Sequence, residues 1–518
     1  MNHWIIAPVV LPAILAPFII MVLRHHLDLQ RIFSVAGSVA LLAISLMLTA
    51  QAADGTVQVY ELGNWPAPFG IVLVLDRLSA LMVLLTATLT LPVVLYSIGS
   101  GWDERGWHFH ALLQFQIMGV CGAFLTGDAF NLFVFFEVLL IASYGLMIHG
   151  GGAVRLRAGV QYVVYNLLGS TLFLFALGTL YAVTGTLNMA DLAVRVAELP
   201  AEDTALLRVG AVLLLLVFAI KAAVLPLHFW LPASYANAPL PVAALFAIMT
   251  KVGAYAILRI YTLVFGPDVA LTEGLVGDWL LPAALATLAV GAIGILGARE
   301  IGRLAAFAAI ASMGTLLIAV SLFTPQAAAA ALYYTVHSTL AAALLFIVAD
   351  LVMERRGGEI APRPPMPQSL LVAGVFFLSA IATAGMPPLS GFLGKLLVMD
   401  AARGADDVWM IWAVILISSL VTIVGLARAG SLIFWKSHDP DAVDQPGYEQ
   451  HDRDGGAKPL PAPEPSPGLA FSAVFMLVGG LVALTVFAGP MMSYAEATAD
   501  QLFEPAAYID TVLGRSDK

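Results

Sequence analysis

Long apolar runs separated by short polar connections make up most of this chain. A helix needs about 20 apolar residues to cross the hydrocarbon core of a bilayer. Fourteen runs of roughly that length stand in the sequence, so we predict fourteen transmembrane helices. They cover residues 4–24, 31–50, 71–99, 109–126, 129–149, 158–183, 206–231, 239–264, 279–298, 302–323, 327–352, 368–399, 408–436 and 469–489.

The composition agrees with this pattern. Of the 518 residues 60% are hydrophobic and only 11% are charged, whereas about a quarter of the residues in a soluble domain are charged. We therefore predict an all-α polytopic membrane protein. The net charge of −10 argues against a nucleic-acid partner. The single cysteine, Cys121, excludes internal disulfides. Without a nucleotide-binding loop or a metal-ligand cluster in the sequence, we expect no cofactor and no metal.

The distribution of basic residues sets the predicted orientation. With the N-terminus outside, fourteen of the 24 Lys and Arg residues fall on the inside, six fall outside and four fall within helices. This positive-inside split places both termini on the outer, periplasmic side. Arg259 counts among the six outside residues. Residues 437–467 hold seven prolines and are expected to form an extended inside loop, and the tail after the fourteenth helix is expected to be short and acidic.

Two lysines, Lys221 and Lys251, lie inside apolar segments of the stretch 218–259. A lysine at membrane depth costs roughly 2.5–3.5 kcal/mol, so it needs a wet cavity or a partner. Pro226 and Pro232 follow the first lysine and predict a broken helix. A broken helix beside an intramembrane charge is typical of an ion pathway.

A weak internal repeat is also visible. Lys395 lies near a second proline break, 174 residues and five helices after Lys221. An odd number of helices per unit predicts two inverted repeats, helices 4–8 and 9–13, with helices 7 and 12 broken. The same shift sets Ala311 against Glu137. The predicted division of the chain is 1–105 (helices 1–3), 106–265 (first repeat), 266–436 (second repeat), 437–467 (loop) and 468–518 (helix 14 and tail).

The candidate proton-transfer residues are Glu137, Lys221, Lys251, His337 and Lys395. Glu137 has no cation near it in sequence, so we predict Lys221 as its partner and the pair as a switch. His337 fits a relay between Lys251 and Lys395, because an imidazole holds or releases a proton near neutral pH. The structural alternatives are a packing ion pair, a hydrogen-bonded core histidine and lysines that reach to the interface.

Four further residues are candidates for the proton pathway: His228, Thr250, Ser338 and Tyr165. For the hydroxyl groups, a hydrogen bond to a carbonyl of their own helix is an equally good interpretation. Asp76 and Arg77 begin the third helix, where capping or interface anchoring is the favoured interpretation.

Several stretches resemble a known family. FFEVLLIASYGL, NAPLPVAALFAIMTKVGAYAILR, VHSTLAAALLF and GMPPLSGFLGK resemble the antiporter-like subunits shared by Mrp cation/proton antiporters, respiratory complex I and membrane-bound hydrogenases. The resemblance covers roughly 70–430 and is strongest to the D subunits of the multisubunit Mrp (Mnh/Pha) Na⁺/H⁺ antiporters. It implies fourteen helices and several different partner subunits. The glutamate, lysines and histidine of the family fall on the five proton-transfer residues above, and a lysine at Lys395 favours Mrp over complex I.

From these observations we predict a proton-translocating subunit of a secondary-active Na⁺ or K⁺/proton antiporter, not an enzyme, in the bacterial inner membrane. Its partners are other membrane subunits, lipid and the transported ions. One alternative is a redox-driven proton-pumping subunit of complex I or a membrane-bound hydrogenase, and another is a structural scaffold. The sequence leaves the choice of Na⁺ or K⁺ and the place of cation binding open, because no dense oxygen site is visible.

Overall fold

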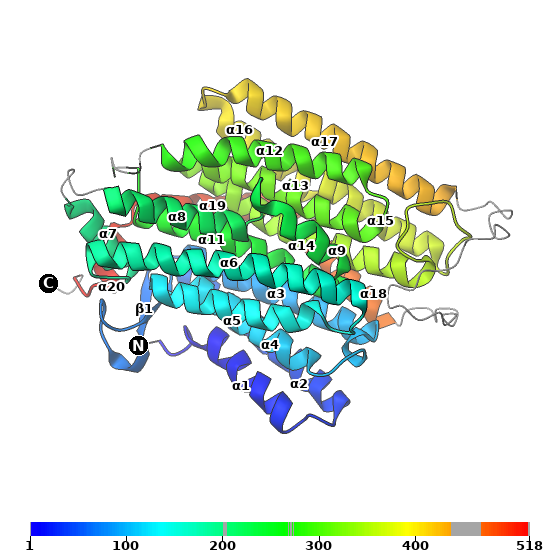
Figure 1. Cartoon of the computed structure of the whole chain (residues 1–518), viewed down its shortest axis with the longest axis horizontal. Coiled ribbons are helices and arrows are strands. Elements are labelled where there is room, and N and C mark those ends of the chain that lie inside the picture. The colour runs from blue at the N-terminus through cyan, green and yellow to red at the C-terminus, as the bar shows by residue number, and fades with distance from the viewer. Residues whose placement is uncertain are drawn as a thin grey trace.

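The computed structural model describes residues 2–199, 205–267, 269, 272, 274–436 and 468–515. In these residues the helices run side by side as one bundle (Figure 1). Each of the fourteen predicted segments coincides with one helix or two consecutive helices. They are α1 (Ala7–Met21), α2 (Leu27–Ala52), α3 (Arg77–Gly99), α4 (Phe109–Leu125), α5 (Ala129–Met147), α6 (Ala153–Thr184), α8 (Ala205–Lys221) with α9 (Trp230–Asn237), α10 (Leu240–Leu245) with α11 (Ala247–Leu263), α12 (Leu275–Gly297), α13 (Ile301–Ser321), α14 (Pro325–Arg356), α15 (Ser369–Ala384) with α16 (Ser390–Ala401), α17 (Val408–Gly430) and α18 (Gly468–Val486).

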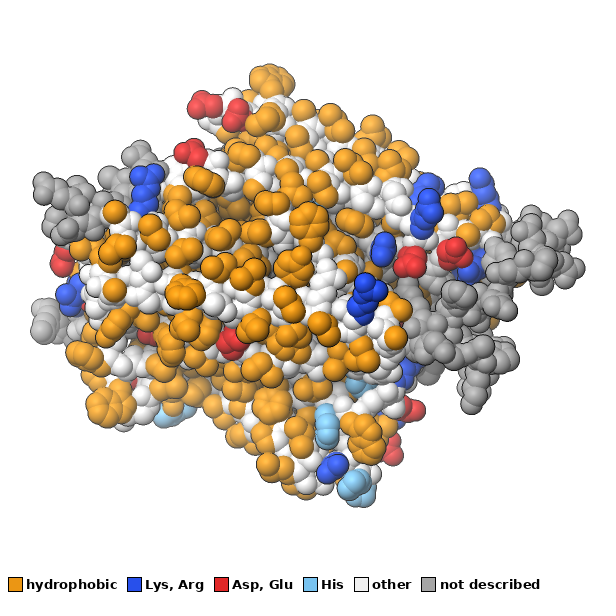
Figure 2. All heavy atoms as spheres, viewed as in Figure 1, with side chains coloured by type: hydrophobic (Ala, Val, Ile, Leu, Met, Phe, Trp, Pro, Cys, Tyr) orange, Lys and Arg blue, Asp and Glu red, His pale blue; other side chains and the backbone are white. Residues whose placement is uncertain are grey.

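The outer surface of the bundle is that of a membrane protein. Ten spans in the described part of the chain are long and apolar enough to cross a bilayer. On the face drawn in Figure 2, hydrophobic side chains cover the middle, and most charged side chains lie toward the two ends. The predicted polytopic all-helical fold is confirmed.

Elements that the apolar pattern did not predict lie outside these spans. They are the hairpin β1 (Gln58–Glu61) with β2 (Val72–Leu75), the turns η2 (Trp102–Glu104) and η4 (Leu227–Phe229), and the helices α7 (Met189–Glu198), α19 (Ala488–Phe503) and α20 (Ala506–Val512). The hairpin, α20 and both ends of the chain lie at one end of the bundle, on the left in Figure 1, which we call the terminal end.

Two sequence predictions need correction here. Residues 72–75 are a strand and not the start of the third helix, because a short apolar run does not by itself distinguish the two. The helix begins at Arg77, where Asp76 and Ser79 form a reciprocal capping box. The tail after α18 is also more than a short acidic extension. Small buried residues such as Ala495 and Ala499 let α19 pack closely on α14. The predicted loop 437–467 lies outside the described residues.

The internal repeat is visible as matching contacts. A Cβ on Gly119 of α4 would meet the Leu139 nitrogen at 2.6 Å, and one on Gly291 of α12 would meet the Ala311 nitrogen at 2.5 Å. Both members of the second pair stand 172 residues after those of the first. The same shift separates α6, residues 153–184, from α14, residues 325–356. The shift of 174 inferred from two lysines is therefore wrong by two, and Ala309 corresponds to Glu137. The repeat boundaries stay a prediction.

Candidate functional site

The first predicted helix break lies next to Lys221. This lysine is the last residue of α8, and regular α-helix resumes at α9. The indole N–H of Trp230 donates to the carbonyl of Ile220 over 3.0 Å, and the N–H of Leu225 donates to the hydroxyl of Thr287 over 2.8 Å. A break inside an apolar bundle is tolerated where such partners satisfy the freed backbone groups.

Lys221 and Glu137 do not form the direct ion pair that the sequence predicted. The ammonium of Lys221 donates to the side-chain oxygen of Asn166 over 3.2 Å. The carboxylate of Glu137 accepts a hydrogen bond from Ser170. Asn166 and Ser170 lie one turn apart on α6, so this helix stands between the two charges. The charge of Glu137 still acts on Lys221 across this polar bridge.

Lys251 is the most deeply buried member of the row, with 1% of its surface exposed. Its ammonium lies 3.3 Å from the sulfur of Met313 on α13, and within the described chain it has no carboxylate in ion-pair range. Gly253 lets α11 approach the first break, because a Cβ there would lie 2.8 Å from the backbone nitrogen of Ala222. Snorkelling to an interface is therefore excluded for Lys251 in this conformation.

The second break, between α15 and α16, holds two predicted residues. The Nδ1 atom of His337 lies 2.9 Å from the hydroxyl of Ser390, at the start of α16. Lys395 folds back and donates to the carbonyl of Ala384, the last residue of α15, over 2.8 Å, and to the hydroxyl of Ser419 over 2.9 Å. A cation at the C-terminal end of a helix is favoured by the helix dipole.

The two lysines do not occupy equivalent places in the repeats. Lys221 ends the half-helix before its break, whereas Lys395 lies in the half-helix after its break. Their spacing of 174 residues is therefore no measure of the repeat.

Polar side chains continue between the two breaks. The rings of Tyr334 and His337 have centroids 5.6 Å apart on α14. A Cβ on Gly391 would lie 2.8 Å from the Nε2 atom of His337, so the imidazole packs directly on the backbone of α16. The charges of Lys251 and Lys395 both act on His337. Four of the five predicted residues are thus buried, and neighbouring charges along the row act on one another.

The comparisons with known proteins decide the family. Residues 126–422 match the family described as NADH:quinone oxidoreductase/Mrp antiporter, TM. The chain belongs to this family. The predicted family resemblance is confirmed.

Relatives match over nearly the whole chain. The D subunit of a probable K⁺/H⁺ antiporter of Rhizobium meliloti is 39% identical, with 99% of this chain and 98% of the relative covered. The D subunit of a Na⁺/H⁺ antiporter of Bacillus subtilis is 38% identical, with 99% and 100% covered. These relatives are transporter subunits and not enzymes, as predicted.

Solved structures give the same result. A chain of the Mrp complex from Dietzia sp. DQ12-45-1b superposes with a TM-score of 0.86 at 30% identity, covering 99% of this chain and 100% of that one. A chain of respiratory complex I from Thermus thermophilus gives 0.77 at 25% identity, covering 96% and 99%. Both belong to complexes, as the predicted partner subunits require.

The secondary candidates for the pathway in this antiporter-family chain are less central. His228 is buried in η4, and its Nδ1 atom has no partner among the described residues. Thr250 and Ser338 bond carbonyls of their own helices, those of Ala247 and Thr335, at 3.4 Å. Tyr165 is 38% exposed on the outside of α6 and does not join the row.

Sequence reasoning missed some residues that contact the row. Asn166, Ser390 and Ser419 each bind one of its side chains directly. The spacing of Asn166 and Ser170, four residues apart on an apolar helix, was an available signal. Within the described residues, no group of three or more His, Cys, Asp or Glu side chains has the arrangement of a metal site.

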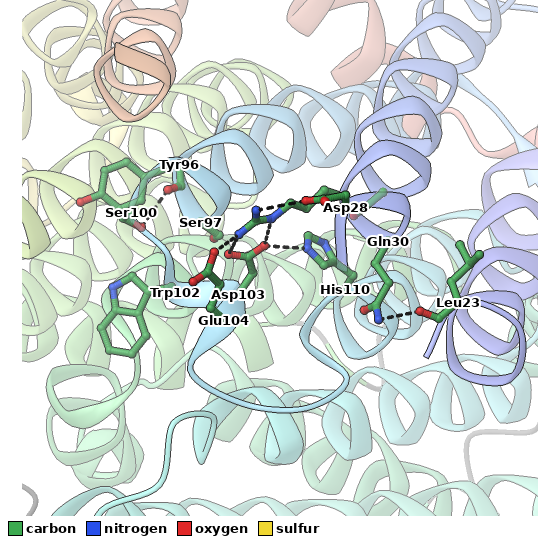
Figure 3. Close-up of polar contacts among 12 residues, drawn as sticks. Leu23, Asp28, Gln30, Tyr96, Ser97, Ser100, Trp102, Asp103, Glu104 and His110 are labelled. Atoms are coloured by element: carbon green, nitrogen blue, oxygen red, sulfur yellow. Dashed lines mark hydrogen bonds and ion pairs between the residues drawn. The ribbon is translucent and has the colours of Figure 1, made fainter. Parts of the chain in front are cut away.

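A second polar cluster lies outside the row, around η2, and Figure 3 shows it. Arg31 donates to both oxygens of Asp103, over 2.7 and 3.1 Å, and the Nε2 atom of His110 lies 3.1 Å from the same carboxylate. The indole of neighbouring Trp102 donates to Asp350 of α14. This cluster ties α2, α4 and α14 together at the end of the bundle opposite to the terminal end.

Proposed function

We propose that this chain is the proton-translocating subunit of a multisubunit monovalent cation/proton antiporter. The observation that carries the proposal is the row itself: Lys221, Lys251, His337 and Lys395 are buried, and three of them contact one of the two helix breaks. Isolated charges are costly at membrane depth, and scaffolding alone does not require them.

The row moves protons by local exchange between neighbouring groups. A carboxylate on Glu137 stabilises the ammonium of Lys221, and the amide of Asn166 joins the two sides. When Glu137 takes up a proton, that stabilisation is lost and Lys221 passes its charge toward Lys251. His337 accepts a proton at one ring nitrogen and releases it from the other, toward Lys395. Waters complete the steps between groups that are not in contact.

The driving force is the electrochemical gradient. Each proton that crosses the membrane potential releases about 2.3 kcal/mol per 100 mV. Coupled to a shared switch, this energy moves Na⁺ or K⁺ outward. The two breaks, at residues 222–229 and 385–389, are the places where the half-channels open and close.

The orientation is part of the proposal. The positive-inside split puts the terminal end on the outer, periplasmic side of the bacterial inner membrane. The units 106–265 and 266–436 are the two inverted repeats, with 1–105 and 468–518 packed around them. Glu137 is partly exposed on α5, and a carboxylate at membrane depth does not face lipid. A neighbouring subunit of the complex therefore covers this face.

The transported cation follows from the relatives only as a pair of choices. One relative is named for K⁺ and another for Na⁺. The second candidate function is a redox-driven proton pump, and the likeness to complex I favours it. Its proton flux would depend on NADH or H₂ and not on a Na⁺ or K⁺ gradient.

The test uses the whole complex in inside-out membrane vesicles. Acidification is first imposed, and Na⁺ or K⁺ is then added while the internal pH is followed. The proposal expects cation-dependent proton release with the native chain and its loss with Glu137→Gln at normal assembly. Preserved release with Glu137→Gln, or flux that requires NADH or H₂, contradicts it.

A further inference from the structure

A second set of buried polar residues connects Lys251 with the terminal end. Lys251, Tyr255 and Arg259 stand four residues apart on α11, so they share one helix face. Arg259 lies about 12 Å further along the helix axis than Lys251. All three side chains are buried. Arg259 is therefore not the exposed outside residue that the sequence predicted.

Arg259 makes a two-pronged ion pair with Asp76 at the start of α3. The two nitrogens of its guanidinium donate to the two carboxylate oxygens over 2.6 and 2.8 Å. Asp76 is 2% exposed and Arg259 is 3% exposed. Because both charges are out of water, each depends on the other. The neighbouring Arg77 takes no part, since its guanidinium donates to the carbonyls of Ala53 and Ala497.

Aromatic rings cover this pair on two sides. The ring of Tyr508, from the C-terminal helix α20, lies 5.2 Å from the guanidinium carbon of Arg259. The hydroxyl of Tyr255 donates to the carbonyl of Phe124 over 2.8 Å and lies 3.4 Å from the Nε atom of Arg259. Tyr508 is itself buried. The ion pair thus separates Lys251 from the terminal end, and α20 closes over it.

We propose that Asp76 and Arg259 form the gate between the terminal end and Lys251, with Tyr508 as its lid. This inference rests on the proposed function. When the lid is displaced, water reaches the pair and a carboxylate oxygen of Asp76 takes a proton from it. The carboxyl then gives that proton, through water beside Tyr255, to the neutral amine of Lys251 and becomes a carboxylate again. One proton moves inward and nothing else changes.

The fixed charge of Arg259 makes this route selective. A guanidinium keeps its proton at all physiological pH values, so the gate always carries a positive charge. Such a charge repels Na⁺ and K⁺ from the pathway, whereas a proton passes through the carboxyl group. The cation of the antiporter therefore does not cross through this gate.

The experiment neutralises both partners at once, with Asp76→Asn and Arg259→Gln in the complete complex. Two amides hydrogen-bond to each other without leaving a buried charge alone, so the complex is expected to assemble. Cation-dependent proton release in vesicles is expected to fall roughly tenfold or more, since a proton-transfer group is gone. The matched control is Asp191→Asn with Arg195→Gln, an Arg–Asp pair at the same end with Arg195 exposed, which is expected to change nothing.

A native rate in the assembled double variant overturns the gate. Where the double variant does not assemble, Tyr255→Phe decides: a reduced rate supports the gate and an unchanged rate overturns it. Tyr508→Ala adds a second readout, a faster proton leak without added cation, and an unchanged leak contradicts the lid. Lys251→Ala is measured in the same vesicles. If it abolishes release while the gate variants do not, only the gate fails, and if it also has no effect, the proposed function fails.

Discussion

The ammonium of Lys221 donates its hydrogen bond to Asn166 over 3.2 Å, at the point where α8 ends. Asn166 thereby stands where the sequence placed the carboxylate of Glu137. An amide cannot balance the charge of the lysine, but it holds the ammonium in place while the carboxylate acts from the far side of α6. The two charges are coupled without being locked in contact, which suits a switch better than a closed ion pair does.

Asn166→Leu tests this bridge. The substitution leaves the buried ammonium of Lys221 without its hydrogen bond, at a cost of about 1–3 kcal/mol. Cation-dependent proton release is expected to fall roughly tenfold, with the complex still assembled. Thr171→Val is the control, because Thr171 is an exposed residue of the same helix that bonds its own backbone. Equal rates for the two variants would show that the bridge has no role.

The contact between His337 and Ser390 makes a second prediction. His337→Ala removes the relay and is expected to abolish proton release. Ser390→Ala only frees the imidazole to turn, so a smaller loss is expected. Ser338→Ala serves as the reference, since this hydroxyl bonds only the carbonyl of Thr335. Proton release is measured at several pH values, and a structural role alone would leave the shape of the pH profile of Ser390→Ala unchanged.

The close approach of α4 and α5 predicts a loss of assembly. Gly119→Val places new atoms within 2.6 Å of the Leu139 backbone, and overpacking of this kind costs about 1–3 kcal/mol or more. The amount of assembled complex on a native gel should drop sharply. Gly178→Ala should be harmless, because a Cβ at that position meets no atom within 4 Å. Normal assembly of Gly119→Val would show that the two helices are free to separate.

Asp103 predicts a dependence of stability on pH. Burial alone would raise the pKa of Asp103, but the hydrogen bonds from His110 and Arg31 outweigh burial and hold the pKa below its usual value. Its stabilising contribution is therefore present at neutral pH and is lost as the pH falls below about 4 and through the lowered pKa. Thermal unfolding of the purified complex should show a gap between the native chain and Asp103→Asn at pH 7 that narrows in acid. A gap independent of pH would contradict the assignment.

The helices of this fold were predictable because an apolar bilayer leaves the backbone no alternative partner. The run that ends in Val72–Leu75 was misread for the opposite reason. These four residues lie at the end of the bundle, where pairing with β1 satisfies the backbone as well as a helix does. The tail was misread because its charges hid the small residues Ala495 and Ala499, which face α14.

The candidate site was predictable in its members and not in its contacts. A lysine in an apolar run reveals itself by its desolvation cost, so Lys221, Lys251 and Lys395 stood out. Which partner each lysine finds depends on how neighbouring helices are turned, and a sequence pattern does not give that rotation. Asn166 and Ser419 therefore remained hidden, and Arg259 was counted as an exposed residue although it pairs with Asp76.

The central claim is that the buried row carries protons. It is tested most directly by the initial rate of Na⁺- or K⁺-dependent proton release from inside-out vesicles that hold the complete complex, with the native chain and with Lys251→Ala at equal assembly. The account predicts that the native chain releases protons when the cation is added and that Lys251→Ala does not. An unchanged rate with Lys251→Ala would contradict it.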